Sequence, residues 1–440
     1  MKTAKKMAIS LSVVIACITG IVFGFSLFPK QEDIHFDYAD LPANLITDAE
    51  FKTAGHTGFD INTYVDDYSL VYNNLDGTKT MYVFTHPINY QTKSGLLTLI
   101  DNELIYNEVD HSFSNKSSDI VFSGRLGNAG IQYDDKIISI KIPSENEPQM
   151  QEIQTLLGNR QEAIGYFIND NYTLYTFPTY LGMRIQLNIS NKIPQDIFLP
   201  IDYSDYIIDD TNDFYVQFID DNNDTKGLVY QPVIKDANGD IYRLLKGVSI
   251  ESDKLVLSQE ALSKMNFVYP ISLEFSINAY RKKQADSSIL SGLPNDNQYL
   301  DNYLYVGENQ QFSHSLSLIR FESSLYKIID ASKIISATYT FSSINDKLVT
   351  VSAEQCDKEW ASTKITWNTR DLFSNEIALS TNIEKKYELD ITDLLKSWIT
   401  GDADPHLGFQ LSTKEKSTGL IFPSADNGYC SPRLIVTYEA

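Results

Sequence analysis

The sequence has few cysteines and a shortage of positive charge. Three cysteines occur in 440 residues, and no CxxC pair or histidine-rich spacing accompanies them. Lys and Arg number 36 against 58 Asp and Glu, for a formal charge of −22. Nucleic acids and anionic surfaces would be repelled, because Lys and Arg carry the affinity for phosphate. We therefore expect no nucleic-acid partner, and the sequence indicates no metal site.

Catalytic motifs are also missing. The chain contains no GxSxG, HExxH, GxxxxGK[ST] or GxGxxG pattern, the local signatures of nucleophile, metal and phosphate sites. Carboxylate pairs arise by chance among so many acidic residues, and a solvated acidic surface explains them better. The histidines share no spacing: His35, His56, His86, His111, His314 and His406. These absences predict a protein that is not an enzyme and uses no cofactor.

The N-terminal residues 1–30 predict a membrane or export segment. Lys2, Lys5 and Lys6 precede 22 uncharged residues, 7–28, which as a helix rising about 1.5 Å per residue would span a hydrocarbon core of about 30 Å. With the lysines inside, the remaining chain lies outside the plasma membrane. A transmembrane anchor ranks first, a cleaved signal peptide second and a lipoprotein signal ending at Cys17 third. The expected location is the outer side of the membrane or the cell surface.

Short alternating strands dominate residues 34–276. Two hairpins are indicated, by SLVYNNLDGTKTMYVFTHPINY (69–90) around Asp76-Gly77 and by VIKDANGDIYRLL (233–245) around Asn238-Gly239. The acidic stretch DDNNDTKG (220–227) lacks the glycine and glutamate positions of a calcium loop, which favours a hairpin turn. Only short windows near 150–157 and 258–265 are helical in pattern. The region is predicted to be β-rich.

One convincing helix is predicted in the C-terminal third, within DITDLLKSWITGDADPHLGFQL (390–411). Thr392 is placed to cap it, Gly401 to end it, and Trp398 falls on one face with Leu394 and Leu395. The pattern predicts a short amphipathic helix lying on a sheet.

The order of motifs around this helix resembles a known family. The segments LYVGENQQFSHSLSLIRFESS (304–324), DKEWASTKITWN (357–368), the helix itself and IFPSADNGYCSPRLIVTYEA (421–440) follow the pattern of a DNRLRE domain, a β-sandwich module of bacterial surface proteins. The resemblance covers residues 284–440. It implies a jelly-roll-like sandwich and, since similar modules bind carbohydrates including alginate, a polysaccharide ligand.

Residues 31–283 resemble the region that precedes the repeats in wall-associated and Rhs-type YD-repeat proteins. The similar segments are HPINYQTKSGLLTLIDNELI (86–105), NYTLYTFPTYLGMRIQLNIS (171–190), GLVYQPVIKDANGDIY (227–242) and FVYPISLEFSI (267–277). The sequence therefore predicts an all-β protein with three parts: a segment of residues 1–30, a β-rich region of residues 31–283, and a C-terminal sandwich with one short helix, residues 284–440.

Candidate ligand contacts are few. Trp360, Trp367 and Trp398 are all the tryptophans of the chain, and their patterns favour packing over sugar stacking. Exposed tyrosines around the LYVG strand are the better candidates: Tyr299, Tyr303 and Tyr305. Cys356 and Cys430 could form one disulfide in an oxidising compartment, and two unpaired thiols fit equally well.

Together these patterns predict a non-catalytic extracellular protein that binds a cell-wall or extracellular polysaccharide. The first alternative is a structural module of a surface or secretion apparatus that binds protein. A polysaccharide-degrading enzyme ranks third.

Overall fold

The computed structural model describes most of the chain beyond the first fifty residues. The described ranges are 52–60, 66–95, 97–133, 136–203, 206–280, 285–321, 329–345, 348–370, 374–381, 385–405, 407–415, 418–429 and 431–440. Within these ranges β-strands dominate and the helices are short, so the predicted all-β class is confirmed. The predicted N-terminal segment 1–30 lies outside the described residues. In the part that is described, no helix has the length and apolarity needed to cross a membrane.

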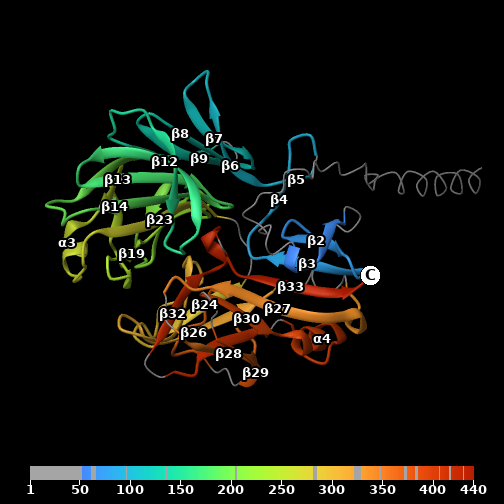
Figure 1. Cartoon of the computed structure of the whole chain (residues 1–440). Coiled ribbons are helices and arrows are strands. Elements are labelled where there is room, and N and C mark those ends of the chain that lie inside the picture. The colour runs from blue at the N-terminus through green and yellow to red at the C-terminus, as the bar shows by residue number, and fades with distance from the viewer. Residues whose placement is uncertain are drawn as a thin grey trace, which may run out of the picture.

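The strands build two lobes, each a pair of packed sheets (Figure 1). One sheet of the N-terminal lobe has the order β21 (Val248–Glu251), β22 (Lys254–Leu257), β15 (Ile197–Asp202), β10 (Lys136–Lys141), β9 (Asn128–Tyr133), β8 (Ile120–Arg125), β7 (Ser112–Ser117) and β6 (Asp101–Asn107). The facing sheet has the order β11 (Gln149–Gln154), β12 (Arg160–Asn169), β13 (Tyr172–Pro178), β14 (Gly182–Ile189), β23 (Ile271–Ala279), β18 (Thr225–Tyr230), β17 (Tyr215–Ile219) and β16 (Ile207–Asp209), with β19 (Val233–Lys235) and β20 (Ile241–Arg243) beside β23.

The N-terminal lobe is held together by alternating side chains. Along β8, Ile120 and Phe122 are buried while Val121 is exposed, which is the pattern of a strand with one face on a core. The buried residues of both sheets form one cluster. The lobe is therefore a β-sandwich.

The C-terminal lobe is a second sandwich. One sheet has the order β29 (Ser374–Thr381), β28 (Thr350–Cys356), β31 (Phe409–Thr413), β26 (Ser313–Arg320), β25 (Tyr303–Asn309) and β32 (Gly419–Pro423), with β24 (Ala285–Leu290) paired to β26. The other has the order β1 (His56–Phe59), β2 (Ser69–Asn74), β3 (Thr78–Phe84), β33 (Arg433–Glu439), β27 (Ile334–Ser342) and β30 (Lys386–Asp390). A separate ribbon pairs β4 (Asn89–Gln91) with β5 (Leu97–Leu99).

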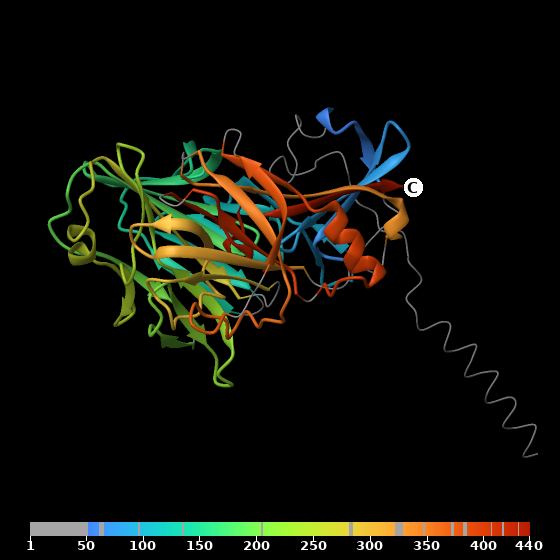
Figure 2. The ribbon, with the colours of Figure 1, turned by 90° about the horizontal axis from the view of Figure 1, so that it is seen from below.

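Strands from the start of the chain complete the C-terminal sandwich. β3 pairs antiparallel with β33 from Thr78 opposite Glu439 to Phe84 opposite Arg433, and Figures 1 and 2 show these strands beside the C-terminus. The division between residues 283 and 284 stays a prediction. Without β1 to β3, β33 would present an unpaired edge, which natural sheets avoid.

The helix α4 (Thr392–Thr400) is confirmed where the sequence predicted it. Gly401 ends it in a left-handed conformation with φ of 81°, and Leu394, Leu395 and Trp398 are buried against the core. The predicted cap was wrong. Thr392 is the first helical residue, and its N–H donates to the Asp390 carboxylate at 2.9 Å.

Local predictions elsewhere had mixed outcomes. The hairpins around Asp76 and Asn238 are confirmed as β2–β3 and β19–β20, and the acidic stretch 220–227 spans the turn between β17 and β18. A short helix, α3 (Gln259–Ser263), lies within residues 258–265, where the sequence pattern predicted one. The helix predicted near residues 150–157 was wrong, because Gln149–Gln154 form the strand β11, which pairs with β12. Two short turns of 3₁₀-helix complete the described elements, η3 (Ala331–Lys333) and η4 (Ala425–Asn427).

The two lobes share an apolar interface. Phe214, Tyr230 and Phe177 from the N-terminal lobe lie in one buried cluster with Phe312 and Tyr429 from the C-terminal lobe. Such a cluster belongs to a common core and fixes the lobes against each other.

Candidate functional site

Two of the three candidate tyrosines are buried. Tyr303 and Tyr305 are 2% and 0% exposed, so the expectation that they are exposed was wrong. They sit on β25, and the cluster that buries their rings includes residues of both lobes. Tyr299 precedes this strand and is half-buried. A ligand role for the three tyrosines stays a prediction.

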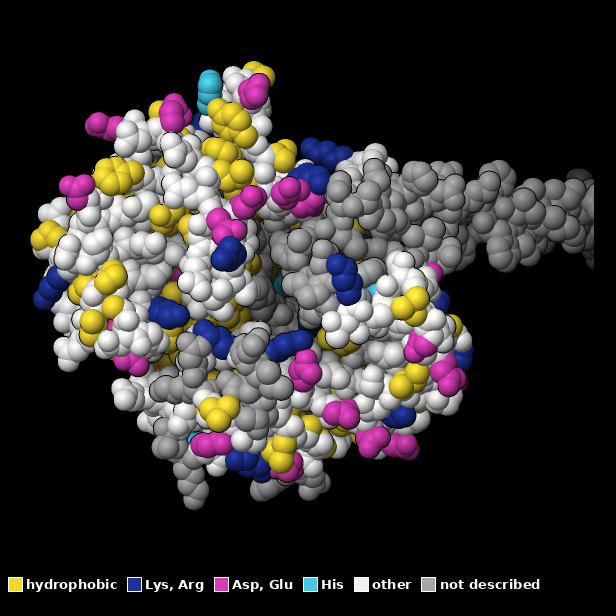
Figure 3. Space-filling view, in the orientation of Figure 1, with side chains coloured by type: hydrophobic (Ala, Val, Ile, Leu, Met, Phe, Trp, Pro, Cys, Tyr) yellow, Lys and Arg dark blue, Asp and Glu magenta, His cyan; other side chains and the backbone are white. Residues whose placement is uncertain are grey.

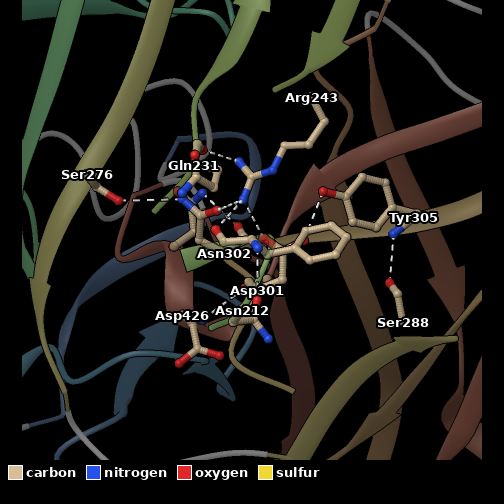
Figure 4. Close-up of polar contacts among 12 residues, drawn as sticks. Asn212, Gln231, Arg243, Ser276, Ser288, Asp301, Asn302, Tyr305 and Asp426 are labelled. Atoms are coloured by element: carbon tan, nitrogen blue, oxygen red, sulfur yellow. Dashed lines mark hydrogen bonds and ion pairs between the residues drawn. The ribbon is translucent and has the colours of Figure 1, made fainter. Parts of the chain in front are cut away.

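Tyr305 belongs to a polar network centred on Arg243, which is fully buried (Figure 4). The Arg243 guanidinium donates to the Asp301 carboxylate at 2.6 Å, to the Asn302 side chain at 3.0 Å and to the Gln231 carbonyl at 2.6 Å. The Tyr305 hydroxyl donates to the second Asp301 oxygen at 2.8 Å. Because a buried charge is tolerated only when paired and hydrogen-bonded, this network explains why Tyr305 points inward.

A second buried ion pair lies within the N-terminal lobe and reaches across the same interface through a hydrogen bond to Asn427. Arg184 donates to Glu274 at 2.5 Å and, through its other terminal nitrogen, to the Asn427 side chain at 2.6 Å. Arg184 and Glu274 are each 1% exposed, and the Arg184 guanidinium also lies 5.3 Å from the Tyr429 ring centre. Asn427 is in η4 of the C-terminal lobe, so this pair holds η4 on the N-terminal lobe.

Carboxyl groups are concentrated beside these pairs. Burial raises the pKa of Asp286 to about 7, although its carboxylate accepts the Ala425 N–H at 2.8 Å, and the charge of Asp301 adds to the increase. Burial, followed by the charges of Asp286 and Asp301, raises the pKa of Asp426 well above its usual range. The interface thus destabilises ionised carboxylates.

We expect this arrangement to make part of the stability pH-dependent. A folded-state pKa above the ordinary 3.8 means that the folded chain binds the Asp286 proton more tightly, so the contribution of Asp286 is present below about pH 4 and is lost as the pH rises through about 7. Urea unfolding of the chain and of Asp286→Asn at about pH 5 and about pH 8 tests this. The variant should gain stability relative to the parent at the higher pH. A gain at the lower pH instead would contradict the assignment.

A surface cluster on the C-terminal lobe is centred on Trp367, which is half-buried and packs on the apolar cluster that contains Trp360 and Ile365. The Arg370 guanidinium lies 3.4 Å from the indole centre, and the His314 ring meets the indole edge-on at 5.6 Å. His314 Nδ1 is 3.1 Å from the Glu308 carboxylate. Arg370 thus covers one face of the indole, and the polar groups beside the ring suit a hydroxyl-rich ligand. We call Trp367, Arg370, His314 and Glu308 the Trp367 cluster.

The loop that carries Trp367 is fixed by asparagines of the 294–299 loop. Asn297 donates to the carbonyls of Ser362 and Ile365 at 2.6 and 2.7 Å, and the Asn368 N–H donates to the Pro294 carbonyl at 2.9 Å. These bonds position the loop, and His314 of β26 contacts the indole from the sheet. The other two tryptophans pack as predicted, Trp360 at 4% and Trp398 at 3% exposure.

Cys356 lies at the end of β28 and is buried, and burial raises the pKa of its thiol to about 12. Cys430 lies outside the described residues, so the predicted pairing of the two cysteines stays a prediction. Acidic side chains spread over the visible faces of both lobes (Figure 3), and in the described part of the chain no three His, Cys, Asp or Glu residues are grouped as a metal site would require.

Residues 277–438 match the family model of carbohydrate-binding module family 96. The match supports a carbohydrate-binding domain in the C-terminal part of the chain, and a carbohydrate partner. No curated protein matches the chain. The DNRLRE name and the likeness of residues 31–283 to wall-associated proteins stay predictions.

Sequence reasoning missed Arg370 and His314. For Trp367 the sequence predicted packing, which the structure shows in part, but the strand-like context ITW gave no sign that residue 367 lies in a turn. The available signal was the composition of residues 294–297, Pro-Asn-Asp-Asn, together with Asn368, since such residues mark loops.

Proposed function

We propose that the chain is a non-catalytic protein of the cell surface that binds a cell-wall or extracellular polysaccharide through its C-terminal lobe. The match of residues 277–438 to a carbohydrate-binding module family carries this proposal. The Trp367 cluster supplies a ring surface and polar groups of the type that sugars use. The formal charge of −22 favours a neutral polysaccharide over an acidic one.

Retention on polysaccharides tests the proposal. The full chain, purified in a non-ionic detergent so that residues 1–30 do not drive adsorption, is incubated with a panel of neutral and acidic polysaccharides. Bound protein and newly released reducing or unsaturated chain ends are both measured. We expect retention on at least one neutral polysaccharide and no release. Release above a heat-inactivated control would favour the enzyme alternative, and absence of retention would favour the protein-binding alternative.

Trp367→Ala should weaken retention about threefold to tenfold, because an aromatic contact contributes about 0.5–1.5 kcal/mol. Phe167→Ala is the matched control, since Phe167 is an exposed aromatic residue of the N-terminal lobe and its loss should not change retention. Both variants are first compared with the parent by thermal melting. Equal retention by folded Trp367→Ala would remove the Trp367 cluster from the proposal.

A further inference from the structure

His314 combines an ionisable ring with access to solvent inside the Trp367 cluster. It lies on β26, and the side chains of His314 and Glu308 are 41% and 38% exposed. His314 Nδ1 is 3.1 Å from a Glu308 carboxylate oxygen. The two residues are directly opposite each other in the β25–β26 pairing, so the geometry of the sheet brings them together.

The contact with Glu308 decides which nitrogen of the neutral ring carries the proton. A carboxylate only accepts hydrogen bonds, so the proton of the neutral imidazole lies on Nδ1 and Nε2 keeps its lone pair. Among the described residues, His314 Nε2 has no hydrogen-bond partner. Solvent or a ligand therefore supplies the partner of this atom.

The side chain of His314 is held in place by its neighbours. The His314 N–H donates to the Ser291 hydroxyl at 2.8 Å, the Ser291 N–H donates to the His314 carbonyl at 2.8 Å, and the imidazole meets the Trp367 indole edge-on at 5.6 Å. The charged groups that face His314 are Glu308 from β25 and, across the indole, Arg370 from the Trp367 loop. Ser291, which follows β24, adds no charge. The ring is thus positioned before a ligand arrives, which lowers the entropic cost of binding.

We propose that His314 Nε2 accepts a hydrogen bond from a hydroxyl group of the bound sugar, and that protonation of His314 weakens this binding. The inference rests on the proposed function and names one contact and a regulation of the same site. The neutral ring offers a lone pair to the ligand, whereas the protonated ring offers a second N–H and a positive charge. A neutral sugar that covers the ring removes water from it and supplies no counter-charge, so the complex favours the neutral ring.

The direction of the pH effect follows from this preference. Because the complex binds the His314 proton less tightly than the free chain does, the affinity is fully present at about pH 8 and falls as the pH decreases toward about 5. The positive charge of Arg370 acts in the same direction, and the negative charge of Glu308 acts against it. We expect the affinity at about pH 5 to be about threefold to tenfold lower than at about pH 8, which is the size of one hydrogen bond.

Calorimetric titrations of the full chain with short neutral cello-, xylo- and manno-oligosaccharides, over the range of about pH 5–8, test the inference. His314→Ala should bind about threefold to tenfold more weakly than the parent at about pH 8 and should show no pH dependence. His314→Gln should recover part of the affinity at every pH, because its amide oxygen can accept the same hydrogen bond. Glu308→Gln removes the counter-charge of the imidazolium, so the affinity should begin to fall at a lower pH than in the parent. Thermal melting over the same pH range checks that each variant is folded.

The matched controls are His111→Gln, which replaces an exposed histidine of the N-terminal lobe, and Asp286→Asn, which removes the interface carboxyl group whose pKa is raised to about 7. Both should keep the pH profile of the parent. If the parent binds equally at both ends of the pH range, or if His314→Gln keeps the pH profile of the parent, this inference fails although the proposed function stands. A pH profile that disappears in Asp286→Asn would assign the effect to the interface and also overturn the inference. If the parent binds no glycan in any assay, both proposals fail.

Discussion

Replacing Arg243 by methionine should lower the free energy of unfolding by about 3–5 kcal/mol, because removing one partner of a buried ion pair leaves the other charge uncompensated. Asp301 is 1% exposed and its main positive neighbour is Arg243 at 2.6 Å. The substitution also leaves the Gln231 carbonyl and the Asn302 side chain without their donor. Urea denaturation monitored by circular dichroism measures the loss.

Arg160→Met is the control for this prediction. Arg160 also forms an ion pair, with Glu152 at 3.1 Å, but its side chain is 80% exposed, and exposed pairs contribute only about 0–1 kcal/mol. The double variant Arg243→Met with Asp301→Leu should recover much of the lost stability, since it removes both charges. If Arg243→Met unfolds at the same urea concentration as Arg160→Met, the network does not join the lobes as described.

Local sequence patterns were sufficient for the fold class and for single elements. Alternation with Asp-Gly and Asn-Gly turns identified the β2–β3 and β19–β20 hairpins, because turn chemistry and strand periodicity are encoded within a few residues. The helix predicted near residues 150–157 was wrong, because the structure there is decided by a contact outside the local sequence. Met150 pairs with Ile164 and Ile153 with Gln161, so pairing with β12 overrides the local helical preference.

The burial of β25 could not be predicted, because it depends on the second lobe. Alternation in YLYVG correctly indicates a strand over β25, but an isolated sandwich would leave one of its faces in solvent. Here Phe214 of the N-terminal lobe packs on Tyr305, with ring centres 6.4 Å apart. No local sequence pattern indicates that Phe214 and Tyr305, which are far apart in the sequence, pack against each other.

The candidate sites are similarly non-local. Trp367 meets His314 of β26 at 5.6 Å, although the two residues are far apart in the sequence and each has an ordinary local context. Neither was among the predicted ligand contacts. Their proximity exists only in the folded chain.

Trp398→Ala should lower the free energy of unfolding by about 3–5 kcal/mol, because it removes a large buried side chain and leaves a cavity. Trp398 is 3% exposed and lies with Leu394 and Leu395 on the face of α4 that packs on the core beneath β27. This effect is a large share of a stability of about 5–15 kcal/mol. Urea denaturation gives the size of the loss, and glycan retention is measured at a temperature at which the variant is still folded.

Trp367→Ala provides the contrast that makes this prediction specific. The two residues are both tryptophans of the C-terminal lobe, but one lies in the core and the other is half-buried under Arg370. Trp398→Ala should lose stability and keep its affinity for the polysaccharide, whereas Trp367→Ala should keep most of its stability and lose affinity. If folded Trp398→Ala binds less polysaccharide while it melts like the parent, α4 belongs to the ligand surface and its packing role is wrong.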